Sequence, residues 1–310
     1  MQLRHILSTK QFLDRQFLEE IFSMADHFRT KAKSKFDKTL SGKILVSLFY
    51  EPSTRTRFSF EAAMLKLGGE VISTESAGHF SSAMKGESLE DTVRVIGGYA
   101  DVIVLRHPEV GAAERAARIS AVPIINAGDG QGEHPTQALL DLYTIRTELG
   151  RTHDITIALV GDLLYGRTIH SLIHLLSLYR NIKIFLVSPR ELRLPAEYKS
   201  FLKNKGVYFR EAKRLDAVIS SLDVLYMTRV QKERFRSSAL YESVKNAFVV
   251  DRKILQKLPK RAIIMHPLPR LKEISPAIDG DPRAAYFRQS QNGLYIRMAL
   301  LWRLFKKETV

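Results

Sequence analysis

The chain has 310 residues, of which 45% are hydrophobic and 26% are charged, a composition typical of folded globular proteins. It contains no cysteine, which excludes disulfide scaffolds, thiolate metal sites and cysteine nucleophiles. No apolar run approaches the roughly 18–20 residues of a membrane helix, and residues 1–10 lack the features of a signal peptide, so we expect a cytoplasmic protein that does not bind membranes.

The net charge of +15 is unevenly distributed along the chain. Residues 1–150 carry 18 Lys or Arg and 19 Asp or Glu, a net of −1, which leaves 30 and 14, a net of +16, for residues 151–310. A basic half is consistent with a nucleic acid, an anionic small substrate, an acidic partner or a solvated lysine-rich surface. No basic stretch is interleaved with aromatic residues as in a nucleic-acid-binding module, so we expect no nucleic-acid partner.

Helical and strand patterns alternate along the chain, and no internal repeat interrupts them. An amphipathic helix is predicted over residues 12–29 from its apolar spacing. Strands are then predicted over residues 44–50, 70–74, 101–105, 122–125, 155–160, 182–187, 207–210, 224–227 and 262–265. Helices are predicted over residues 54–67, 88–99, 111–119, 135–149, 167–178 and 284–305.

This alternation predicts an α/β protein made of two doubly wound parallel-sheet domains. We expect a first domain over residues 1–134, a linking helix over 135–150 and a second domain over 151–285. The last stretch, about residues 286–310, is too apolar to stand alone, and we expect this helix to pack back on the first domain. Ligands of such folds bind at the carboxyl ends of the strands, where the strand order reverses.

The strongest chemical motif is Ser53-Thr54-Arg55-Thr56-Arg57, which directly follows a predicted strand and opens a helix. Ser53 is a suitable N-cap, and the first N–H groups of the helix add to the hydroxyl and guanidinium donors. Charge-assisted hydrogen bonds of this kind contribute about 1.5–3 kcal/mol each. The motif therefore predicts a phosphate-binding site, with an ordinary capped helix and surface arginines as the alternative.

Other predicted strands also end in polar or rigid segments. In chain order these are Arg106-His107-Pro108, residues 128–137 with His134 and Gln137, Thr228-Arg229-Val230-Gln231, and His266-Pro267-Leu268-Pro269. His134 alone is typical of a structural histidine, but the glycines before it allow the backbone to approach a ligand closely. The two prolines at the end of the last segment impose a rigid backbone, and one cis bond is compatible with them.

Three weaker signals have competing interpretations. Residues 161–168 fall one residue short of a nucleotide-binding P-loop, but the bulky residues inside the loop argue against that function. Lys85 precedes a helix and follows a small, polar stretch, which suits either a mobile cationic loop or an ordinary surface lysine. His170 and His174 have the spacing of helical metal ligands without the accompanying carboxylate, so we expect them to be packing or surface residues and expect no metal site.

The motif at residues 53–57 resembles the carbamoyl-phosphate motif of the aspartate/ornithine carbamoyltransferase family, and the resemblance extends over essentially the full chain. The segments at residues 85–87, 161–168, 228–231 and 266–269 are similar to those of the catalytic chains of the aspartate branch. The resemblance implies transfer of the carbamoyl group of carbamoyl phosphate to the α-amine of L-aspartate. The products would be N-carbamoyl-L-aspartate and phosphate, in de novo pyrimidine (UMP) biosynthesis, without a cofactor.

The resemblance also implies roles for individual residues. The phosphate would be held by Ser53, Thr54, Arg55 and Thr56. The carbamoyl oxygen would be polarised by Thr56, Arg106 and His134. The carbamoyl amino group would contact Gln137 and the backbone of Pro267, Leu268 and Pro269, which also faces the amine of aspartate.

For the second substrate, the resemblance implies that Arg167 and Arg229 bind the two carboxylates, with Gln231 in support. It further implies that Ser81 and Lys85 reach the site from a neighbouring subunit, so that the catalytic unit is a homotrimer. Some relatives also assemble with regulatory chains that bind nucleotides. An ornithine-specific enzyme would use the same chemistry, but Arg167 and Arg229 would repel its cationic substrate.

Overall fold

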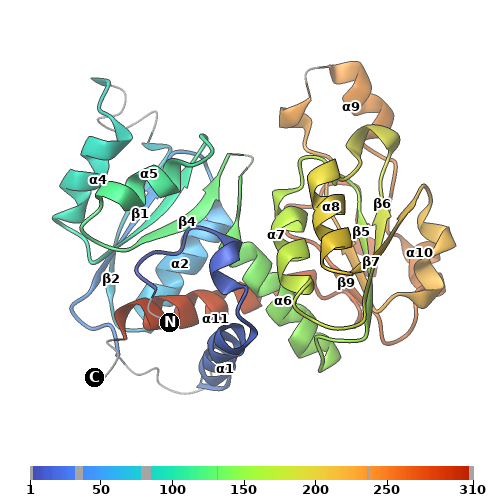
Figure 1. The fold of residues 1–310 in the computed structure, drawn as a ribbon, viewed down its shortest axis with the longest axis horizontal. Helices are drawn as coiled ribbons and strands as arrows, with labels where there is room; N and C mark the ends of the chain where they lie inside the picture. Colours follow the sequence, from blue (N-terminus) through green and yellow to red (C-terminus); the bar gives the residue numbers. More distant parts are fainter. Residues whose placement is uncertain (1–2, 32–37, 78–84, 131, 236, 307–310) are drawn as a thin grey trace. The chain divides into compact units, whose positions relative to one another are not determined.

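The computed structural model describes residues 3–31, 38–77, 85–130, 132–235 and 237–306 (Figure 1). The chain divides into two compact units. The first consists of Met1–Leu139 with Gln291–Val310, and the second of Leu140–Ser290. No helix among the described residues has the length and apolarity needed to cross a membrane.

The first unit is built on a parallel sheet in the order β2-β1-β3-β4. Its strands are β1 (Ile44–Phe49), β2 (Glu70–Glu75), β3 (Val102–His107) and β4 (Ile124–Asp129). The chain moves outward from β1 in one direction to β2 and in the other to β3 and β4, so the strand order reverses between β1 and β3. The sheet therefore has the topology of a doubly wound fold.

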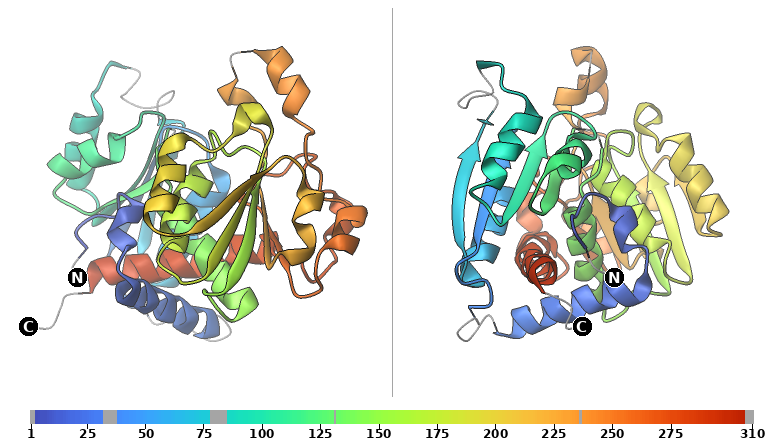
Figure 2. Two further views of the ribbon diagram at one scale, coloured as in Figure 1. Left: turned by 45° about the vertical axis from the view of Figure 1, so that its right-hand side comes forward. Right: turned by 60° about the vertical axis from the view of Figure 1, so that its left-hand side comes forward.

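Helices cover both faces of this sheet (Figure 2). On one face, α4 (Leu89–Gly97) and α5 (Ala112–Ile119) pack on apolar side chains of β1, β3 and β4. Elsewhere in the unit lie η1 (Thr9–Phe12), α1 (Arg15–Lys31), α2 (Thr54–Lys66) and the end of α11 (Tyr286–Phe305). Arg297 of α11 donates to the Ser59 hydroxyl of α2 at 3.0 Å and lies over the Phe60 ring. This confirms that the C-terminal helix packs back on the first unit.

The second unit has a parallel sheet in the order β7-β6-β5-β8-β9, which reverses between β5 and β8. Its strands are β5 (Ile155–Val160), β6 (Ile182–Val187), β7 (Tyr208–Ala212), β8 (Val224–Met227) and β9 (Ile263–Met265). Its helices are α7 (Arg167–Leu176), α8 (Ala196–Asn204), α9 (Ser238–Val244) and α10 (Arg252–Lys257), with short turns η3 (Arg190–Leu192), η4 (Leu215–Ala217), η5 (Ile219–Ser221), η6 (Lys232–Arg234) and η7 (Pro276–Ile278). The helix α6 (Pro135–Leu149) and α11 each span a boundary between the two units.

Two predicted boundaries differ from the structure by three or more residues, for identifiable reasons. The first long helix begins at Arg15 and not at residue 12, because residues 9–12 form the separate turn η1, which Ser8 and Gln11 cap at its start, and Asp14 accepts the Phe17 N–H at 2.7 Å to begin α1. The fourth strand is predicted to end at residue 125, whereas β4 continues to Asp129 because its polar residues pair with β3.

Candidate active site

The predicted phosphate-binding motif lies where β1 ends and α2 begins, beside the reversal of the first sheet. Thr56 is buried at 9% exposure, Ser53 is half-buried, and Thr54 and Arg55 are exposed. The first turn of α2 contains no acidic residue, so the positive end of the helix dipole is not neutralised from within the helix. This segment can therefore offer hydroxyl, guanidinium and backbone donors to an anion.

Two details of the motif differ from expectation. Ser53 occupies the N-cap position without a side-chain capping bond, and its N–H donates to Glu75 Oε1 at 3.1 Å instead. Arg57 is engaged with β2: its Nη1 donates to the Ser73 hydroxyl at 3.1 Å and its Nη2 lies 3.3 Å from Glu75 Oε2. Arg57 therefore ties α2 to β2, and it is not among the residues to which a phosphate role is assigned.

Arg106 lies next to this motif because β3 pairs with β1, with Phe49 and Arg106 in register. Its Nη1 donates to the Ala127 carbonyl at 3.1 Å, and its Nε lies 3.6 Å from Glu51 Oε2. These contacts hold the guanidinium group between the ends of β1 and β4. The sheet topology thus brings Arg106 and the Ser53 segment to one edge, as predicted.

The glycine-rich segment after β4 is organised by Asp129, a residue that the sequence pattern does not single out. The Asp129 carboxylate accepts the N–H groups of Gly111 at 2.8 Å and Glu133 at 3.0 Å. Gly130 has a φ of +48°, and a Cβ atom there would lie 2.3 Å from the Pro108 carbonyl oxygen. The glycine at this position is therefore required by the neighbouring backbone after β3.

His134 and Gln137 lie at the start of α6, directly after this segment. His134 is 5% exposed and Gln137 is 9% exposed, and the Gln137 N–H donates to the His134 carbonyl at 3.0 Å. The preceding Glu133 accepts the Ser8 hydroxyl and the Thr9 N–H, both at 2.6 Å, which anchors the approach to the helix. His134 and Gln137 are thus held together on the first turn, as expected.

In the second unit, the segment between β5 and α7 is organised by a single buried carboxylate. Asp162 is completely buried and accepts the Tyr165 N–H at 2.9 Å and the Gln231 N–H at 3.5 Å. Burial raises the pKa of Asp162, although these hydrogen bonds oppose the shift. In this loop the Asp162 carboxylate accepts a backbone N–H group of the kind that a P-loop would offer to a phosphate.

The same contacts position the basic and amide side chains that the sequence indicates. Arg167 is the first residue of α7, directly after the Asp162 loop, and Arg229 follows β8. Gln231 Nε2 donates to the Tyr165 carbonyl at 3.0 Å. Since β5 and β8 flank the reversal of the second sheet, these three residues lie at the position where such folds bind ligands.

The rigid segment after β9 also has the predicted character. The Leu268–Pro269 bond is cis, and Leu268 has a φ of +54°, in the left-handed region that a non-glycine residue rarely adopts. Pro267 and Leu268 are half-buried and Pro269 is exposed. His266, directly before them, is buried and accepts the Leu268 N–H at its Nδ1 atom at 2.8 Å.

The remaining candidates from the sequence are Lys85, Ser81 and the histidines of α7. Lys85 is exposed, and Ser81 lies outside the described residues. His170 Nε2 lies 2.9 Å from the Leu163 carbonyl and its ring stacks on Tyr198 at 4.1 Å, so it is a packing residue as predicted. Within the ranges that the structure describes, no cluster of His, Asp and Glu side chains has an arrangement that could hold a metal ion.

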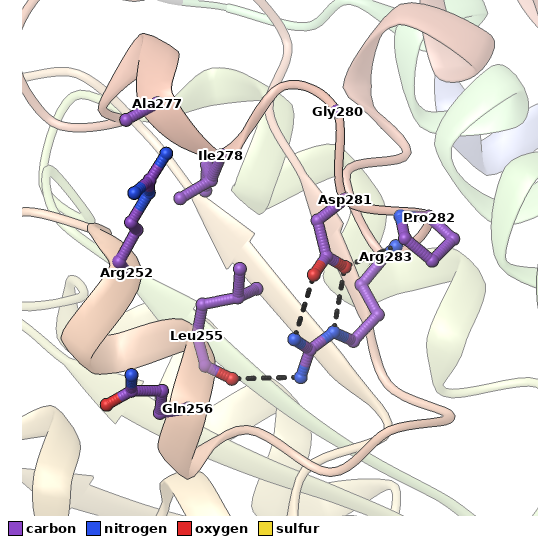
Figure 3. Close-up of a pocket in the computed structure, with 9 residues that line it drawn as sticks. All are labelled: Arg252, Leu255, Gln256, Ala277, Ile278, Gly280, Asp281, Pro282 and Arg283. Atoms are coloured by element: carbon purple, nitrogen blue, oxygen red, sulfur yellow. Dashed lines mark hydrogen bonds and ion pairs between the residues drawn. The ribbon is translucent and has the colours of Figure 1, made fainter.

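A hollow of about 520 Å³ in the second unit is separate from these strand ends (Figure 3). One of its two guanidinium groups, on Arg283, is occupied by both Asp281 carboxylate oxygens and by the Leu255 and Leu258 carbonyls, at 2.8–3.0 Å. This leaves Arg283 little capacity to bind a ligand. The lining residues are Arg252, Leu255, Gln256, Ala277, Ile278, Gly280, Asp281, Pro282 and Arg283.

Comparison with known proteins identifies two family matches that together cover most of the chain. Residues 4–147 match the family described as "Aspartate/ornithine carbamoyltransferase, carbamoyl-P binding domain". Residues 153–304 match "Aspartate/ornithine carbamoyltransferase, Asp/Orn binding domain". The boundary between the matches falls near the end of α6.

Individual proteins are similar over nearly the whole chain. The rice (Oryza sativa subsp. japonica) protein "Aspartate carbamoyltransferase, chloroplastic" is 53% identical over 308 residues, covering 97% of this chain and 85% of the rice protein. The catalytic subunit of M. jannaschii aspartate transcarbamoylase is 51% identical with a TM-score of 0.90, covering 97% of this chain and 98% of that one. The Trypanosoma cruzi aspartate transcarbamoylase, in complex with carbamoyl phosphate and aspartate, is 42% identical with a TM-score of 0.92, covering 98% of each chain.

Proposed function

The chain belongs to the aspartate/ornithine carbamoyltransferase family, and from that premise we propose how its residues carry out the aspartate reaction. The reaction transfers the carbamoyl group of carbamoyl phosphate to the α-amine of L-aspartate, which gives N-carbamoyl-L-aspartate and phosphate, a step of pyrimidine biosynthesis. The observation that carries the proposal is the placement of cationic and amide side chains at both reversals of strand order, one in each unit. Both substrates are anions, so this placement suits them.

In the first unit, carbamoyl phosphate binds at the start of α2. Ser53, Thr54, Arg55 and Thr56 hold the phosphate with hydroxyl, guanidinium and backbone N–H donors. Phosphate is also the leaving group, so these donors stabilise the charge that it gains as the bond to the carbamoyl carbon breaks. A preorganised donor of this kind contributes roughly 3–4 kcal/mol to the lowering of the barrier.

The attack of the amine places negative charge on the carbamoyl oxygen. Arg106, His134 and the Thr56 hydroxyl stabilise this oxyanion, and Gln137 binds the carbamoyl amino group. The support for these roles is that β3 and the start of α6 present them at the same sheet edge as the phosphate residues.

In the second unit, Arg167 and Arg229 bind the two carboxylates of aspartate, and Gln231 assists. Pro267, Leu268 and Pro269 offer backbone groups to the amine and to the carbamoyl amino group. Two guanidinium groups favour a dicarboxylate and disfavour ornithine, whose side chain carries a positive charge. Orienting the two substrates for reaction contributes about 7–11 kcal/mol in well-aligned systems.

We assign the carbamoyl-phosphate-binding domain to residues 1–134 with the C-terminal helix from about 286, the link to 135–150 and the aspartate-binding domain to 151–285. We further propose a homotrimer in which Ser81 and Lys85 serve the site of a neighbouring subunit. A cytoplasmic location and a larger assembly with regulatory chains are part of the same proposal. Cell fractionation and native mass spectrometry of the purified complex test them.

The division of labour between the two units is tested by two arginine variants. Arg55→Ala is expected to lower kcat by roughly 10²-fold or more, because it removes a transition-state donor. Arg229→Ala is expected to raise KM for aspartate about tenfold or more while the Kd of carbamoyl phosphate, measured by calorimetry, stays close to the parent value.

Matched controls are two arginines whose contacts lie on the surface. Arg94 pairs with Asp91 at 3.1 Å and Arg214 pairs with Asp216 at 3.5 Å, and both pairs are exposed. Their alanine variants are expected to have parental kinetics. Loss of carbamoyl-phosphate binding in Arg229→Ala with an unchanged KM for aspartate would contradict the assignment.

A further inference from the structure

A continuous chain of buried hydrogen bonds runs through the second unit, and its central members are not among the substrate-contacting residues assigned above. Its centre is Asp141 of α6, which is completely buried. Asp141 Oδ2 accepts the Tyr226 hydroxyl and Asp141 Oδ1 accepts Gln289 Nε2, both at 2.6 Å. Tyr226 and Gln289 are themselves at most 1% exposed. The carboxylate thus joins α6, β8 and α11.

From Gln289 the hydrogen-bond network continues to the segment after β9. Gln289 Oε1 accepts the His266 N–H at 2.8 Å. The His266 ring then uses both nitrogens: Nδ1 accepts the Leu268 N–H at 2.8 Å, and Nε2 lies 2.9 Å from Glu273 Oε1. A backbone N–H can only donate, so Nδ1 carries no proton and Nε2 is the donor to Glu273. The neutral Nε2–H tautomer is therefore fixed by the geometry.

Both ends of this hydrogen-bond network reach segments to which the proposed function assigns a role. At one end, Leu268 is held in a left-handed conformation with a φ of +54°, which costs a non-glycine residue roughly 1–2 kcal/mol. At the other end, Tyr226 lies in β8, which ends at Met227, two residues before Arg229. The network thus connects the 267–269 segment to the strand that precedes Arg229.

Such a network is costly unless every member is satisfied. A buried polar group without a partner costs about 1–3 kcal/mol, and an apolar core of the same shape would stabilise the unit at least as well. Burial lowers the pKa of His266, although Glu273 opposes the shift, so the ring is neutral near pH 7. A satisfied polar network fixes orientation rather than adding net stability.

We propose that His266 is a positioning residue for the aspartate half-site, which holds the Leu268 backbone through Nδ1 while Gln289 and Asp141 fix its own backbone. This inference rests on the proposed function, because it assigns the 267–269 segment to substrate binding. Aspartate affinity and turnover then depend on an acceptor at the Nδ1 position. The bond to Glu273 contributes to stability and to the orientation of the ring.

Two variants of the same residue separate these roles. In His266→Asn the amide oxygen can take the place of Nδ1 and accept the Leu268 N–H, but the bond to Glu273 is lost. In His266→Gln the amide nitrogen can take the place of Nε2 and donate to Glu273, but the acceptor for Leu268 is lost. We expect His266→Gln to raise KM for aspartate about tenfold or more and to lower kcat, as misplaced binding groups do. His266→Asn is expected to stay within about threefold of the parent KM for aspartate, well below the tenfold change that corresponds to about 1.4 kcal/mol. Its Tm is expected to be lower than that of His266→Gln, because it loses the bond to Glu273.

The tautomer of His266 is measured by NMR, which does not depend on activity. In the ¹⁵N NMR spectrum of the parent, assigned with His266→Asn, the His266 signals are expected to show the neutral Nε2–H tautomer at pH 7. An Nδ1–H tautomer, parental kinetics in His266→Gln, or activity losses in both variants that simply follow their Tm values would overturn the inference. Failure of the parent to carbamoylate aspartate would overturn the proposed function itself, and the inference with it.

Discussion

Buried histidines serve different purposes in this chain, and their partners show which. His266 uses both ring nitrogens to hold backbone and a carboxylate, whereas His170 donates from Nε2 to the Leu163 carbonyl and stacks on Tyr198. Because the carbonyl can only accept, Nε2 of His170 carries the proton. His170 therefore fastens the loop before α7 to the layer formed by α7 and α8.

His170 makes the stability of the protein depend on pH. Burial lowers the pKa of His170 from 6.5, and nearby His174 lowers it further, whereas Glu197 and the Leu163 bond oppose the shift. Below pH 6.5 the unfolded chain therefore binds the proton more readily than the folded chain, so the contribution of His170 to stability is complete above pH 6.5 and is lost as the pH falls. His170→Gln keeps a donor for Leu163 but cannot titrate.

We therefore expect the free energy of unfolding of the parent to fall more steeply between about pH 6.5 and pH 5 than that of His170→Gln. The difference in slope is at most about 1.4 kcal/mol per pH unit. Urea unfolding at fixed protein concentration measures both slopes, and the variant's own curve removes the contribution of other titrating groups. Parallel curves would show that His170 is not held neutral.

At the scale of elements, the turn from β5 into the Asp162 loop depends on one glycine. Gly161 has a φ of +108°, and a Cβ atom there would lie 2.3 Å from the Thr228 carbonyl oxygen, at the end of β8. This close approach allows Thr228, directly after β8, to bond the end of β5: its hydroxyl donates to the Val160 carbonyl at 3.0 Å and accepts the Asp162 N–H at 3.1 Å. The ends of β5 and β8, which flank the reversal of the sheet, are thereby joined. Arg167 and Arg229 lie in the segments that follow these two strands.

Gly161→Ala is therefore expected to be more damaging than an alanine at another left-handed glycine. The matched control is Gly150, which has a φ of +69° and no atom within 4 Å of the position that a Cβ would take. Both variants carry the backbone penalty of about 1–2 kcal/mol, and Gly161→Ala adds roughly 1–3 kcal/mol for the steric overlap. Denaturant unfolding compares the two, and KM for aspartate should rise only in Gly161→Ala. Equal losses of stability would contradict the close approach at Thr228.

The sequence predicts the strands of the two sheets well because buried parallel strands are continuous apolar runs between helical patterns. It fails where the local signal is weak or misleading. The end of β4 has the composition of a loop, and α8, α9 and α10 are short helices with many polar residues, so only tertiary packing identifies them.

In the candidate site, too, the sequence predicts some residues and misses others. Arg55, Arg167 and Arg229 follow strands and Arg106 lies near the end of β3, so the sequence pattern can predict that they lie at strand ends, and their roles stay predictions. Asp162 and Asp141 are not, because their partners are distant in sequence: Gln231 is 69 residues from Asp162, and Gln289 is 148 residues from Asp141. A lone aspartate has no local pattern that reveals such a contact.

At the scale of the whole molecule, the proposed mechanism requires more than one chain at each site. Lys85 is exposed and precedes α4 in the first unit, and we propose that it acts on the substrates of a neighbouring subunit. Homotrimers of Lys85→Ala and of Arg55→Ala are each expected to be inactive. Mixed trimers, formed by dissociation and reassembly, should recover activity because some sites then receive Arg55 from one chain and Lys85 from its neighbour.

Native mass spectrometry establishes that the trimers are mixed. If mixed trimers of the two variants stay inactive, Lys85 belongs to the site of its own chain. The parent carried through the same dissociation and reassembly is the control for recovery.

The central claim is that this chain carbamoylates aspartate, and product identity tests it most directly. The purified protein is supplied with ¹³C-labelled carbamoyl phosphate and equal concentrations of aspartate and ornithine, and the products are identified by mass spectrometry. We predict labelled N-carbamoyl-L-aspartate, released together with phosphate and formed roughly 10²-fold or more slowly when Arg55→Ala replaces the parent at matched concentration. Labelled citrulline as the main product, or no labelled amino acid from a folded protein, would contradict the claim.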